Sequence, residues 1–259
     1  MTLEARVILG KDMLPSIAVI LPAAGKSSRF SGKEKKPFTN LDGRAVWLRA
    51  AEVFITRPEV KQCLVVVAPE DMELFKRRYA ANVMFLNIQI VEGGRERFES
   101  VANALAKLTD DITHVAVHDA VRPCVPSVLV DNVIAAAVKH GAALPAIPVA
   151  ETLKRVNNSM RVEATLARDG LWRAQTPQIF KKEILIEAYQ KRSSLGSAVT
   201  DDAQLVEALG HPVHIVPGSP FNLKITTGDD LGMADVFVKH CKFEAPVKPR
   251  RAFDDERFS

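Results

Sequence analysis

Small residues and cations follow an apolar run near the start of this 259-residue chain. The run "IAVILP" leads into Ala23-Ala24-Gly25, and Lys26 and Arg29 come shortly afterwards. Small side chains let backbone N–H groups approach a nucleotide closely, and cations nearby neutralise phosphate oxygens. We therefore expect this loop to bind a phosphorylated ligand.

Two common phosphate-binding patterns do not fit the loop. Gly25-Lys26-Ser27 looks like the end of a P-loop, but that pattern needs a glycine where Ile20 stands. The dinucleotide pattern G-x-G-x-x-G needs glycines at the positions of Ser27 and Phe30. The phosphate chemistry must be of another kind.

Residues that could handle phosphate also follow the later apolar runs. In an open parallel sheet, ligands bind where loops leave the carboxyl ends of the strands. Five separate segments bring such residues toward that edge: Ala23 to Lys36, Gly93-Gly94-Arg95, His118-Asp119 with Arg122, Thr152 with Lys154 and Arg155, and Lys224. Their convergence predicts one anion-binding site that contains a single well-placed carboxylate, Asp119.

The composition is that of an ordinary globular protein. The formal charge is 35 − 31 = +4, and aromatic residues make up only 6% of the chain. RNA-binding surfaces combine basic residues with clustered aromatics, so we expect no nucleic-acid partner. The most apolar long window, Val128 to Ala150, holds Asp131, Lys139 and His140, which argues against a membrane span. The three cysteines lack C-x-x-C spacing, as expected for reduced thiols in a cytoplasmic protein.

Strand and helix signals alternate along most of the chain. Apolar runs predict strands at 17–25, 63–68, 88–91, 114–123, 142–150, 212–216 and 223–226. Helical spacing predicts helices at 44–55, 71–79, 97–108, 127–139 and 229–240. This alternation indicates an α/β fold with a doubly wound, mostly parallel sheet. Continuous apolarity in the strands agrees with burial on both faces.

The segment from about 150 to 172 interrupts this alternation. Two short β-like runs, "TLKRV" and "RVEATL", flank the turn signal "VNNSM". We expect a β-hairpin arm that projects from the nucleotide-binding domain. We place that domain at 15–242, after an N-terminal extension at 1–14 and before a loosely ordered tail at 243–259.

Several of these segments, taken in order, resemble one enzyme family. They are "LPAAGKSSRF…KKPF", "EGGRERFESV", "VHDAVRP", "VAETLKRV", "ARDGLWRAQTPQIF", "VTDDAQLVEALG" and "NLKITTGDDL". Together they resemble the 2-C-methyl-D-erythritol 4-phosphate cytidylyltransferases of non-mevalonate isoprenoid biosynthesis, over roughly residues 17 to 240. The first loop is shared with many nucleotidyltransferases. "HDAVRP", the threonine of "ETLKR" and "RDGLWRAQTPQ" make the narrower assignment.

The resemblance implies a Rossmann-like nucleotidyltransferase fold and a role for each matching residue. The CTP site would be lined by Ala23, Ala24, Gly25, Gly93, Gly94 and Ser100. The catalytic cations would be Arg29 and Lys36, with Arg168 and Lys224. The polyol phosphate acceptor would meet Arg122, Thr152, Arg168, Thr176 and Lys224. Asp119 would help to hold Mg²⁺. The family also implies a homodimer whose arms embrace.

The chain departs from the family pattern at three places. Lys35 and Lys36 precede Pro37 together, so either lysine could be the catalytic one; the following Pro37-Phe38 favours Lys36. Arg95 stands where the family often has an acidic residue, and Phe221 where it often has a polar or acidic one.

The expected chemistry agrees with the residues independently. A phosphate monoester already carries a nucleophilic oxyanion, so attack on the α-phosphorus of CTP needs charge neutralisation rather than a Ser-His-Asp triad. His118 is accordingly interpreted as a structural residue, not a base. Two alternatives stay open: a cytidylyltransferase for another polyol phosphate such as ribitol 5-phosphate, and a nucleotide-binding module without catalysis.

Overall fold

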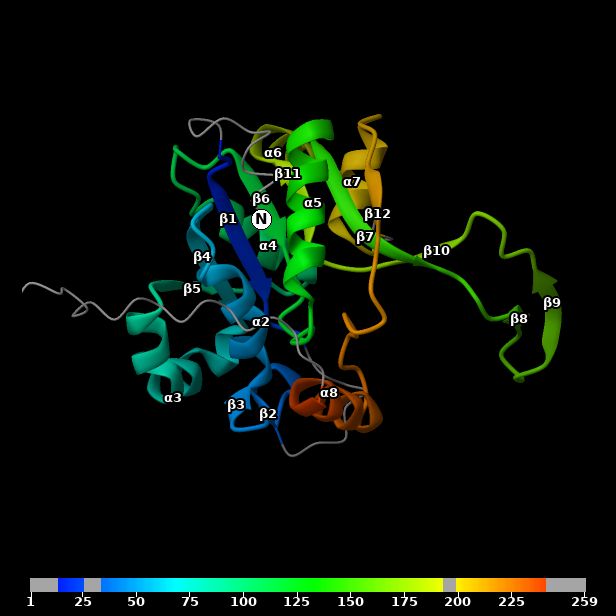
Figure 1. The fold of residues 1–259 in the computed structure, drawn as a ribbon, viewed down its shortest axis with the longest axis horizontal. Helices are drawn as coiled ribbons and strands as arrows, with labels where there is room; N and C mark the ends of the chain where they lie inside the picture. Colours follow the sequence, from blue (N-terminus) through cyan, green and yellow to red (C-terminus); the bar gives the residue numbers. More distant parts are fainter. Residues whose placement is uncertain (1–13, 26–33, 193–198, 241–259) are drawn as a thin grey trace, which may run out of the picture.

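The computed structural model describes residues 14–25, 34–192 and 199–240. Its main sheet is built from β1 Ile17–Pro22, β4 Val60–Val67, β5 Ile88–Glu92, β6 His114–Val117, β7 Ala142–Pro148, β10 Trp172–Ala174, β11 Gln178–Lys181 and β12 His214–Pro217. Their order is β10-β7-β11-β6-β1-β4-β5, and β12 also pairs with β7 (Figure 1). Parallel neighbours flank β1 on both sides, because it pairs with β4 and β6 in parallel register. The predicted α/β fold with a mostly parallel sheet is confirmed.

Helices cover both faces of this sheet. They are α2 Val46–Ile55, α3 Met72–Phe85, α4 Arg97–Leu105, α5 Ser127–His140, α6 Lys182–Gln190, α7 Asp202–Ala208 and α8 Gly228–His240, with 3₁₀ turns η1 Lys36–Phe38 and η2 Pro69–Asp71 and a small hairpin of β2 Asn40–Leu41 and β3 Arg44–Ala45. Alternate side chains of β1 enter two separate apolar cores: Ile17 and Val19 pack with α2, α3 and α5, while Ile20 packs with α4, α6 and α7. Burial on both faces explains why the sequence of β1 is apolar without interruption.

Three details of the sheet differ from the sequence prediction. Residues 223–226 are not a strand; Ile225 N–H donates one hydrogen bond to the Val121 carbonyl at 2.9 Å instead. The short strands β10 and β11 were not expected. They run antiparallel to their neighbours, with β11 inserted between β6 and β7. A four-residue segment such as "QIFK", with two apolar residues at its centre, is too short to show the pattern of a strand.

The predicted arm is present as β8 Leu153–Val156 and β9 Val162–Leu166. The two strands pair antiparallel with each other and form a sheet of their own. In Figure 1 this hairpin stands at the far right, away from the body of the chain, and β10 carries the chain back to the main sheet. The predicted N-terminal extension, apart from Leu14, and the C-terminal tail lie outside the described residues.

Candidate active site

The predicted nucleotide-binding loops meet at the carboxyl ends of β1, β4 and β5. Ala23 N–H donates to the Val66 carbonyl and Gly93 N–H to the Val67 carbonyl, each at 2.8 Å. A Cβ atom on Gly93 would lie 2.8 Å from Ala24 Cβ and 3.0 Å from the Ser100 hydroxyl, so no larger residue fits there without movement. The structure therefore brings these small residues together as predicted.

Ser100 holds the second glycine loop in place. Its buried hydroxyl accepts a hydrogen bond from Gly94 N–H and donates one to the Glu96 carbonyl, both at 3.1 Å. Glu96 and Glu99 form a capping box at the start of α4, and the Glu99 carboxylate also accepts from Arg95 N–H. Arg95 thus contributes its backbone to the fixed shape of this loop.

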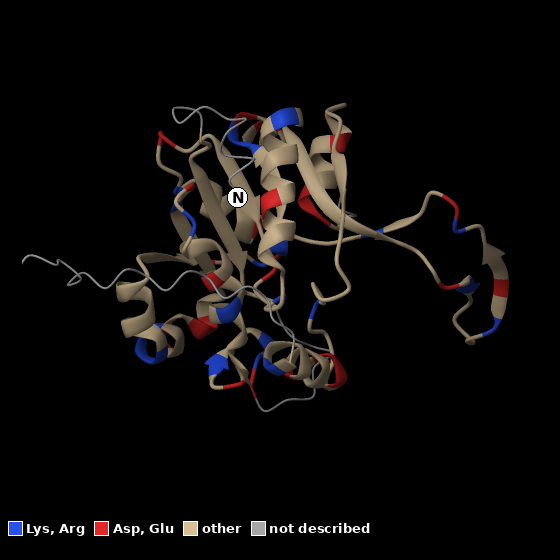
Figure 2. Cartoon of the chain, viewed as in Figure 1, with Lys and Arg blue, Asp and Glu red and all other residues tan. Residues whose placement is uncertain are grey.

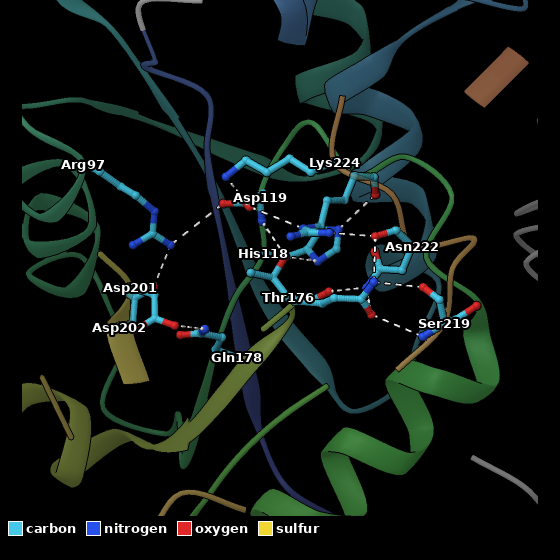
Figure 3. Close-up of polar contacts among 12 residues, drawn as sticks. Arg97, His118, Asp119, Thr176, Gln178, Asp201, Asp202, Ser219, Asn222 and Lys224 are labelled. Atoms are coloured by element: carbon cyan, nitrogen blue, oxygen red, sulfur yellow. Dashed lines mark hydrogen bonds and ion pairs between the residues drawn. The ribbon is translucent and has the colours of Figure 1, made fainter. Parts of the chain in front are cut away.

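Three cations from the described residues surround the carboxylate of Asp119 (Figure 3). Its Oδ2 atom lies 2.9 Å from Lys224 Nζ and 3.4 Å from Arg122 Nε, and its Oδ1 atom lies 3.9 Å from Arg97. Burial opposes ionisation of Asp119, but Lys224, Arg97 and Arg122 outweigh it and hold its pKa well below the ordinary value. Asp119 and Arg122, predicted from one segment, do meet Lys224, predicted from another, in one site.

Arg97 is a member of this cluster that the sequence did not single out. Its guanidinium donates to Asp202 Oδ2 at 2.7 Å, and Tyr189 donates its hydroxyl proton to Asp202 Oδ1 at 2.5 Å. The Asp202 side chain is fully buried. Burial, reinforced by Asp202, raises the pKa of Tyr189 far above its usual range. Arg97, Tyr189 and Asp202 line a cavity of about 360 Å³ beside the cluster.

The quoted motifs contained these residues without revealing the contact. Arg97 is part of "EGGRERFESV" and Asp202 of "VTDDAQLVEALG", and 105 positions separate them along the chain. A pairing across that distance has no signal in residue spacing.

Beneath Asp119, the ring of His118 is completely buried and uses both nitrogens. Its Nε2 lies 3.1 Å from the Arg122 carbonyl and its Nδ1 lies 3.1 Å from the Thr176 hydroxyl. Burial lowers the pKa of His118 to about 4, so the ring is neutral at pH 7. The prediction that His118 is structural rather than a base agrees with this burial.

A buried amide network fixes the loop that carries Lys224. Gln175 donates to the carbonyl groups of Ser219 at 2.9 Å and Asn222 at 3.2 Å, and Asn222 donates to the Thr176 carbonyl at 2.7 Å. Arg122 adds a hydrogen bond to the Asn222 carbonyl at 2.7 Å. These contacts tie the loop before Lys224 to the strand connection that holds Thr176.

Two carboxylates hold Lys35, the first of the two lysines before Pro37. Lys35 Nζ lies 2.6 Å from Asp71 and 3.0 Å from Glu70. Burial lowers the pKa of Lys35, but these carboxylates more than compensate, so it is raised overall. Lys36 opens the turn η1. The predicted catalytic Arg29 lies outside the described residues.

Thr152 and Arg168 lie at the base of the arm rather than in the Asp119 cluster. Both side chains are exposed, and Arg168 donates a hydrogen bond to the Ala150 carbonyl. The chain itself therefore does not bring these two predicted acceptor contacts to Asp119. By contrast with Gly93, a Cβ atom on Gly25 would have no neighbour within 4 Å among the described residues, so those residues do not require glycine there.

The donor set near Asp119 suits a metal that arrives with phosphates. Among residues 14–25, 34–192 and 199–240, no three His, Cys, Asp or Glu side chains gather as a metal cage. Mg²⁺ commonly binds through one or two carboxylates together with substrate phosphates and water. Asp119 Oδ1, whose distance to Arg97 is too long for a hydrogen bond, is the oxygen better placed to receive such an ion.

Charge and hydropathy add two further observations. In the view of Figure 2, positions of Lys and Arg are interspersed with positions of Asp and Glu on both the body and the arm of the described chain. Within the described part of the chain, none of the helices has the length and apolar character needed to cross a membrane.

Comparison with known proteins agrees with the motifs. Residues 17–240 match the family model described as IspD, 2-C-methyl-D-erythritol 4-phosphate cytidylyltransferase. A cytidylyltransferase of that name from Rhodopirellula baltica is 39% identical over 240 residues, covering 88% of this chain and 97% of the relative. One from Syntrophus aciditrophicus is also 39% identical, with the same coverage. The crystal structure of the enzyme from Thermus thermophilus superposes with a TM-score of 0.71 at 33% identity, covering 86% of this chain and 99% of that one.

A second solved structure, the 4-diphosphocytidyl-2C-methyl-D-erythritol synthase of Anaerococcus prevotii, gives a TM-score of 0.72 at 30% identity and covers 87% of this chain and 96% of that one. Both the sequence and the fold of this chain thus match members of that family over nearly all of the described residues. The family predicted from the motifs is confirmed. The chain belongs to the 2-C-methyl-D-erythritol 4-phosphate cytidylyltransferase family and is a cytidylyltransferase.

Proposed function

We propose that this chain transfers CMP from CTP to 2-C-methyl-D-erythritol 4-phosphate. The products are 4-diphosphocytidyl-2-C-methyl-D-erythritol and pyrophosphate, and the step belongs to non-mevalonate isoprenoid precursor synthesis. The observation that carries this proposal is the carboxylate of Asp119 held among Lys224, Arg122 and Arg97 beside the Gly93 loop. Such a cluster can gather several phosphate groups at one point.

The reaction needs electrostatic help more than a proton acceptor. An anionic oxygen of the acceptor phosphate attacks the α-phosphorus of CTP, a new P–O bond forms, and the bond to the β-phosphate oxygen breaks. Pyrophosphate carries away the electron pair. Since the attacking oxygen is already deprotonated, cations around the α-phosphate supply the main stabilisation. The neutral, buried His118 agrees with a site that uses no general base.

The residue roles follow the position of each segment. Small residues at the strand ends would admit the nucleotide: Ala23, Ala24, Gly25, Gly93 and Gly94, with Ser100 holding the second loop. Arg29 and Lys36 would neutralise the triphosphate. The acceptor phosphate would be bound by Arg122 and Lys224 from the cluster, and by Thr152 and Arg168 from an arm.

Asp119 would hold Mg²⁺ together with the phosphates of CTP. Bound there, the ion would supply positive charge against the developing negative charge of the transferred group. Lys224 and Arg122 now occupy the other oxygen of the same carboxylate, so the chain can orient Asp119 before any ligand binds.

We also propose a homodimer in which the arm of one copy completes the acceptor site of the other. The hairpin exposes apolar side chains, among them Met160 and Val162, and Trp172 is exposed where the chain returns to the body. Exposed apolar groups grouped in this way favour a protein partner. The exposed Arg168 and Thr152 at the base of the same arm would then reach a neighbouring cluster. A cytoplasmic location accompanies this proposal.

Pyrophosphate release tests the proposal directly. Purified protein with Mg²⁺ would be given each of the four NTPs together with 2-C-methyl-D-erythritol 4-phosphate or ribitol 5-phosphate. Release with CTP and the methylerythritol acceptor alone is expected, and mixtures without acceptor serve as the control. Preference for ribitol 5-phosphate would support the alternative acceptor, and absence of release with every pair would indicate a non-catalytic module.

A further inference from the structure

The side-chain amide of Gln175 binds the loop between β12 and Lys224 through both its nitrogen and its oxygen. Its Nε2 group donates to the Ser219 carbonyl at 2.9 Å and to the Asn222 carbonyl at 3.2 Å. Its Oε1 atom accepts from Ser219 N–H at 3.2 Å and from Asn222 Nδ2 at 3.4 Å. Dashed lines in Figure 3 lead from Ser219 and Asn222 into this network. One buried side chain thus organises the loop before Lys224.

The loop uses the whole hydrogen-bonding capacity of this amide. A glutamine side chain has two N–H donors and one oxygen with two lone pairs. Both donors of Gln175 face carbonyl groups, which can only accept, and its oxygen faces two N–H groups. The exposed fraction of Gln175 is only 6%. Any part that Gln175 has in the reaction therefore passes through the loop and not through a direct contact with substrate.

The loop backbone is fitted closely to the same amide. A Cβ atom on Gly218 would lie 2.6 Å from Gln175 Oε1 and 2.9 Å from the Ala146 carbonyl oxygen, so a larger residue would push the loop away. Gly218 N–H donates to that carbonyl at 2.7 Å, and Asn222 N–H donates to the Ser219 carbonyl at 3.1 Å, which closes the turn. Glycine at position 218 thus permits the close approach between the loop and Gln175.

Lys224 lies between two fixed points of the backbone. Before it, Asn222 is tied to Gln175. After it, Ile225 N–H donates at 2.9 Å to a carbonyl in the turn that follows Asp119. The Lys224 ammonium reaches Asp119 Oδ2 at 2.9 Å from this backbone. Because the Lys224 side chain is partly exposed, its place in the cluster depends on how firmly the backbone beneath it is held.

We infer that Gln175 is a positioning residue for Lys224. The inference deepens the proposed function and rests on it for the task of Lys224, which is to neutralise phosphate charge during CMP transfer. A cation stabilises a transition state best when its position is set before the ligands bind, and a displacement of about 1 Å can cost much of the rate. Arg122 also donates to the Asn222 carbonyl, so the test separates an effect through Lys224 from one through Arg122.

A first experiment measures the hold on the loop without any turnover. Hydrogen–deuterium exchange of the full chain, read by mass spectrometry, would compare the parent with Gln175→Met, which keeps the length of the side chain and removes the amide. Backbone amides of residues 218–225 should exchange about tenfold faster in the variant, because the loop opens more readily, while those of β1 and β4 keep the parent's rate. Unchanged exchange at 218–225 would overturn the inference. Gln175→Glu keeps the shape and loses both donors, and it replaces Gln175→Met if that protein does not fold.

Gln62→Met is the matched control. The Gln62 amide also joins separate segments, since it donates to the Lys107 carbonyl at 2.8 Å and accepts from Thr109 N–H at 3.2 Å. Gln62 lies near the start of β4, at the opposite end of that strand from the nucleotide-binding loops. Its variant should keep both the turnover and the exchange of 218–225 within about twofold of the parent.

A second experiment asks whether Gln175 acts through Lys224. The rate of CMP transfer would be measured in single turnovers, with enzyme in excess of CTP, for the parent, Gln175→Met, Lys224→Ala and the double variant. Gln175→Met should lower the rate about tenfold when Lys224 is present and less than about twofold when alanine replaces it. A residue that acts through a second one loses its effect once the second side chain is gone.

Equal losses in the two backgrounds would overturn the inference, because they would mark a general structural defect or an effect through Arg122. An unchanged rate in Gln175→Met would overturn it as well. A parent protein that releases no pyrophosphate would count against the proposed function alone. The exchange measurement needs no substrate and would still decide whether Gln175 holds the loop that carries Lys224.

Discussion

Replacing Asp119 by asparagine should affect folding stability and metal dependence by different amounts. The change keeps the size of the side chain but removes the negative charge that Lys224, Arg122 and Arg97 share. The remaining cations would then repel one another around a neutral amide. The loss of stability and the change in Mg²⁺ dependence both arise from the contacts of Asp119. One variant therefore tests both roles that we assign to this carboxylate.

The expected loss of unfolding free energy can be worked out from the closest ion pair, Asp119 with Lys224. Two unit charges at the 2.9 Å between Asp119 Oδ2 and Lys224 Nζ attract by about 6 kcal/mol at an effective dielectric constant of about 20, and by about 1.4 kcal/mol at that of water. The Lys224 side chain is 43% exposed, which favours the lower end. After desolvation is subtracted, we expect the free energy of unfolding to fall by about 1–3 kcal/mol. Turnover should fall by about 10²–10³, as for loss of one preorganised electrostatic contact.

Urea unfolding and pyrophosphate release as a function of Mg²⁺ would measure the two effects separately. Asp42→Asn is a matched control, because Asp42 also lies 2.9 Å from a cation, Arg49, but on an exposed surface. The control should cost less than about 1 kcal/mol and leave turnover unchanged. An Asp119→Asn protein with the parent's Mg²⁺ titration would refute the assignment of Asp119 to the metal.

The remaining predictions concern three other parts of the chain. Lys36→Ala should reduce turnover by about 10²–10³, while Lys35→Ala, whose ammonium is already held by carboxylates, should have a mild effect; a severe loss at Lys35 would reverse the assignment. Arg168→Lys should raise the acceptor KM and leave CTP binding nearly unchanged, because lysine cannot reproduce a bidentate grip; equal weakening of both ligands would contradict an acceptor-specific role. Burial raises the pKa of the Cys63 thiol from 9.0 to about 12, so its contribution to stability is complete below about pH 9 and is lost as pH rises toward 12. Between pH 8 and pH 10 the unfolding free energy of the parent should therefore fall by about 1.4 kcal/mol relative to that of Cys63→Ala. A difference between the two proteins that stays constant over this range would show that folding does not raise the pKa of the thiol.

The central strands could be predicted because the feature that identifies them lies within their own residues. A strand buried on both faces, such as β1, must be apolar at nearly every position, and that signal survives in the sequence alone. The arm was predictable for the same reason, since a turn signal separates two short β-like runs. The short strands β10 and β11 were missed because their pairing with β7 and β6 is set by the sheet they enter and not by their own residues.

The site was predictable only where residues follow strands. Asp119 and Gly93 could be placed at one edge because the carboxyl ends of parallel strands meet there. Arg97 and Asp202 could not, since their contact depends on how α4 and α7 pack on the same face of the sheet. Thr176 shows a further limit: its motif predicted membership of the site, but its contacts with Asp119 N–H and the His118 ring span 57 and 58 positions of the chain and have no signal in residue spacing.

The charge balance of the cluster connects its folded state to its function. Within the described part of the chain, Arg97, Arg122 and Lys224 face two buried carboxylates, Asp119 and Asp202, so three positive charges meet two negative ones there. Near-neutrality lets these groups be buried together, because isolated charges would be expensive to remove from water. The cations differ in partners and in exposure: Arg97 is tied to Asp202, and the Arg122 side chain is only 10% exposed, while that of Lys224 is 43% exposed. Lys224 is therefore the cation that can most readily exchange Asp119 for an arriving phosphate, while the two arginines keep the shape of the site.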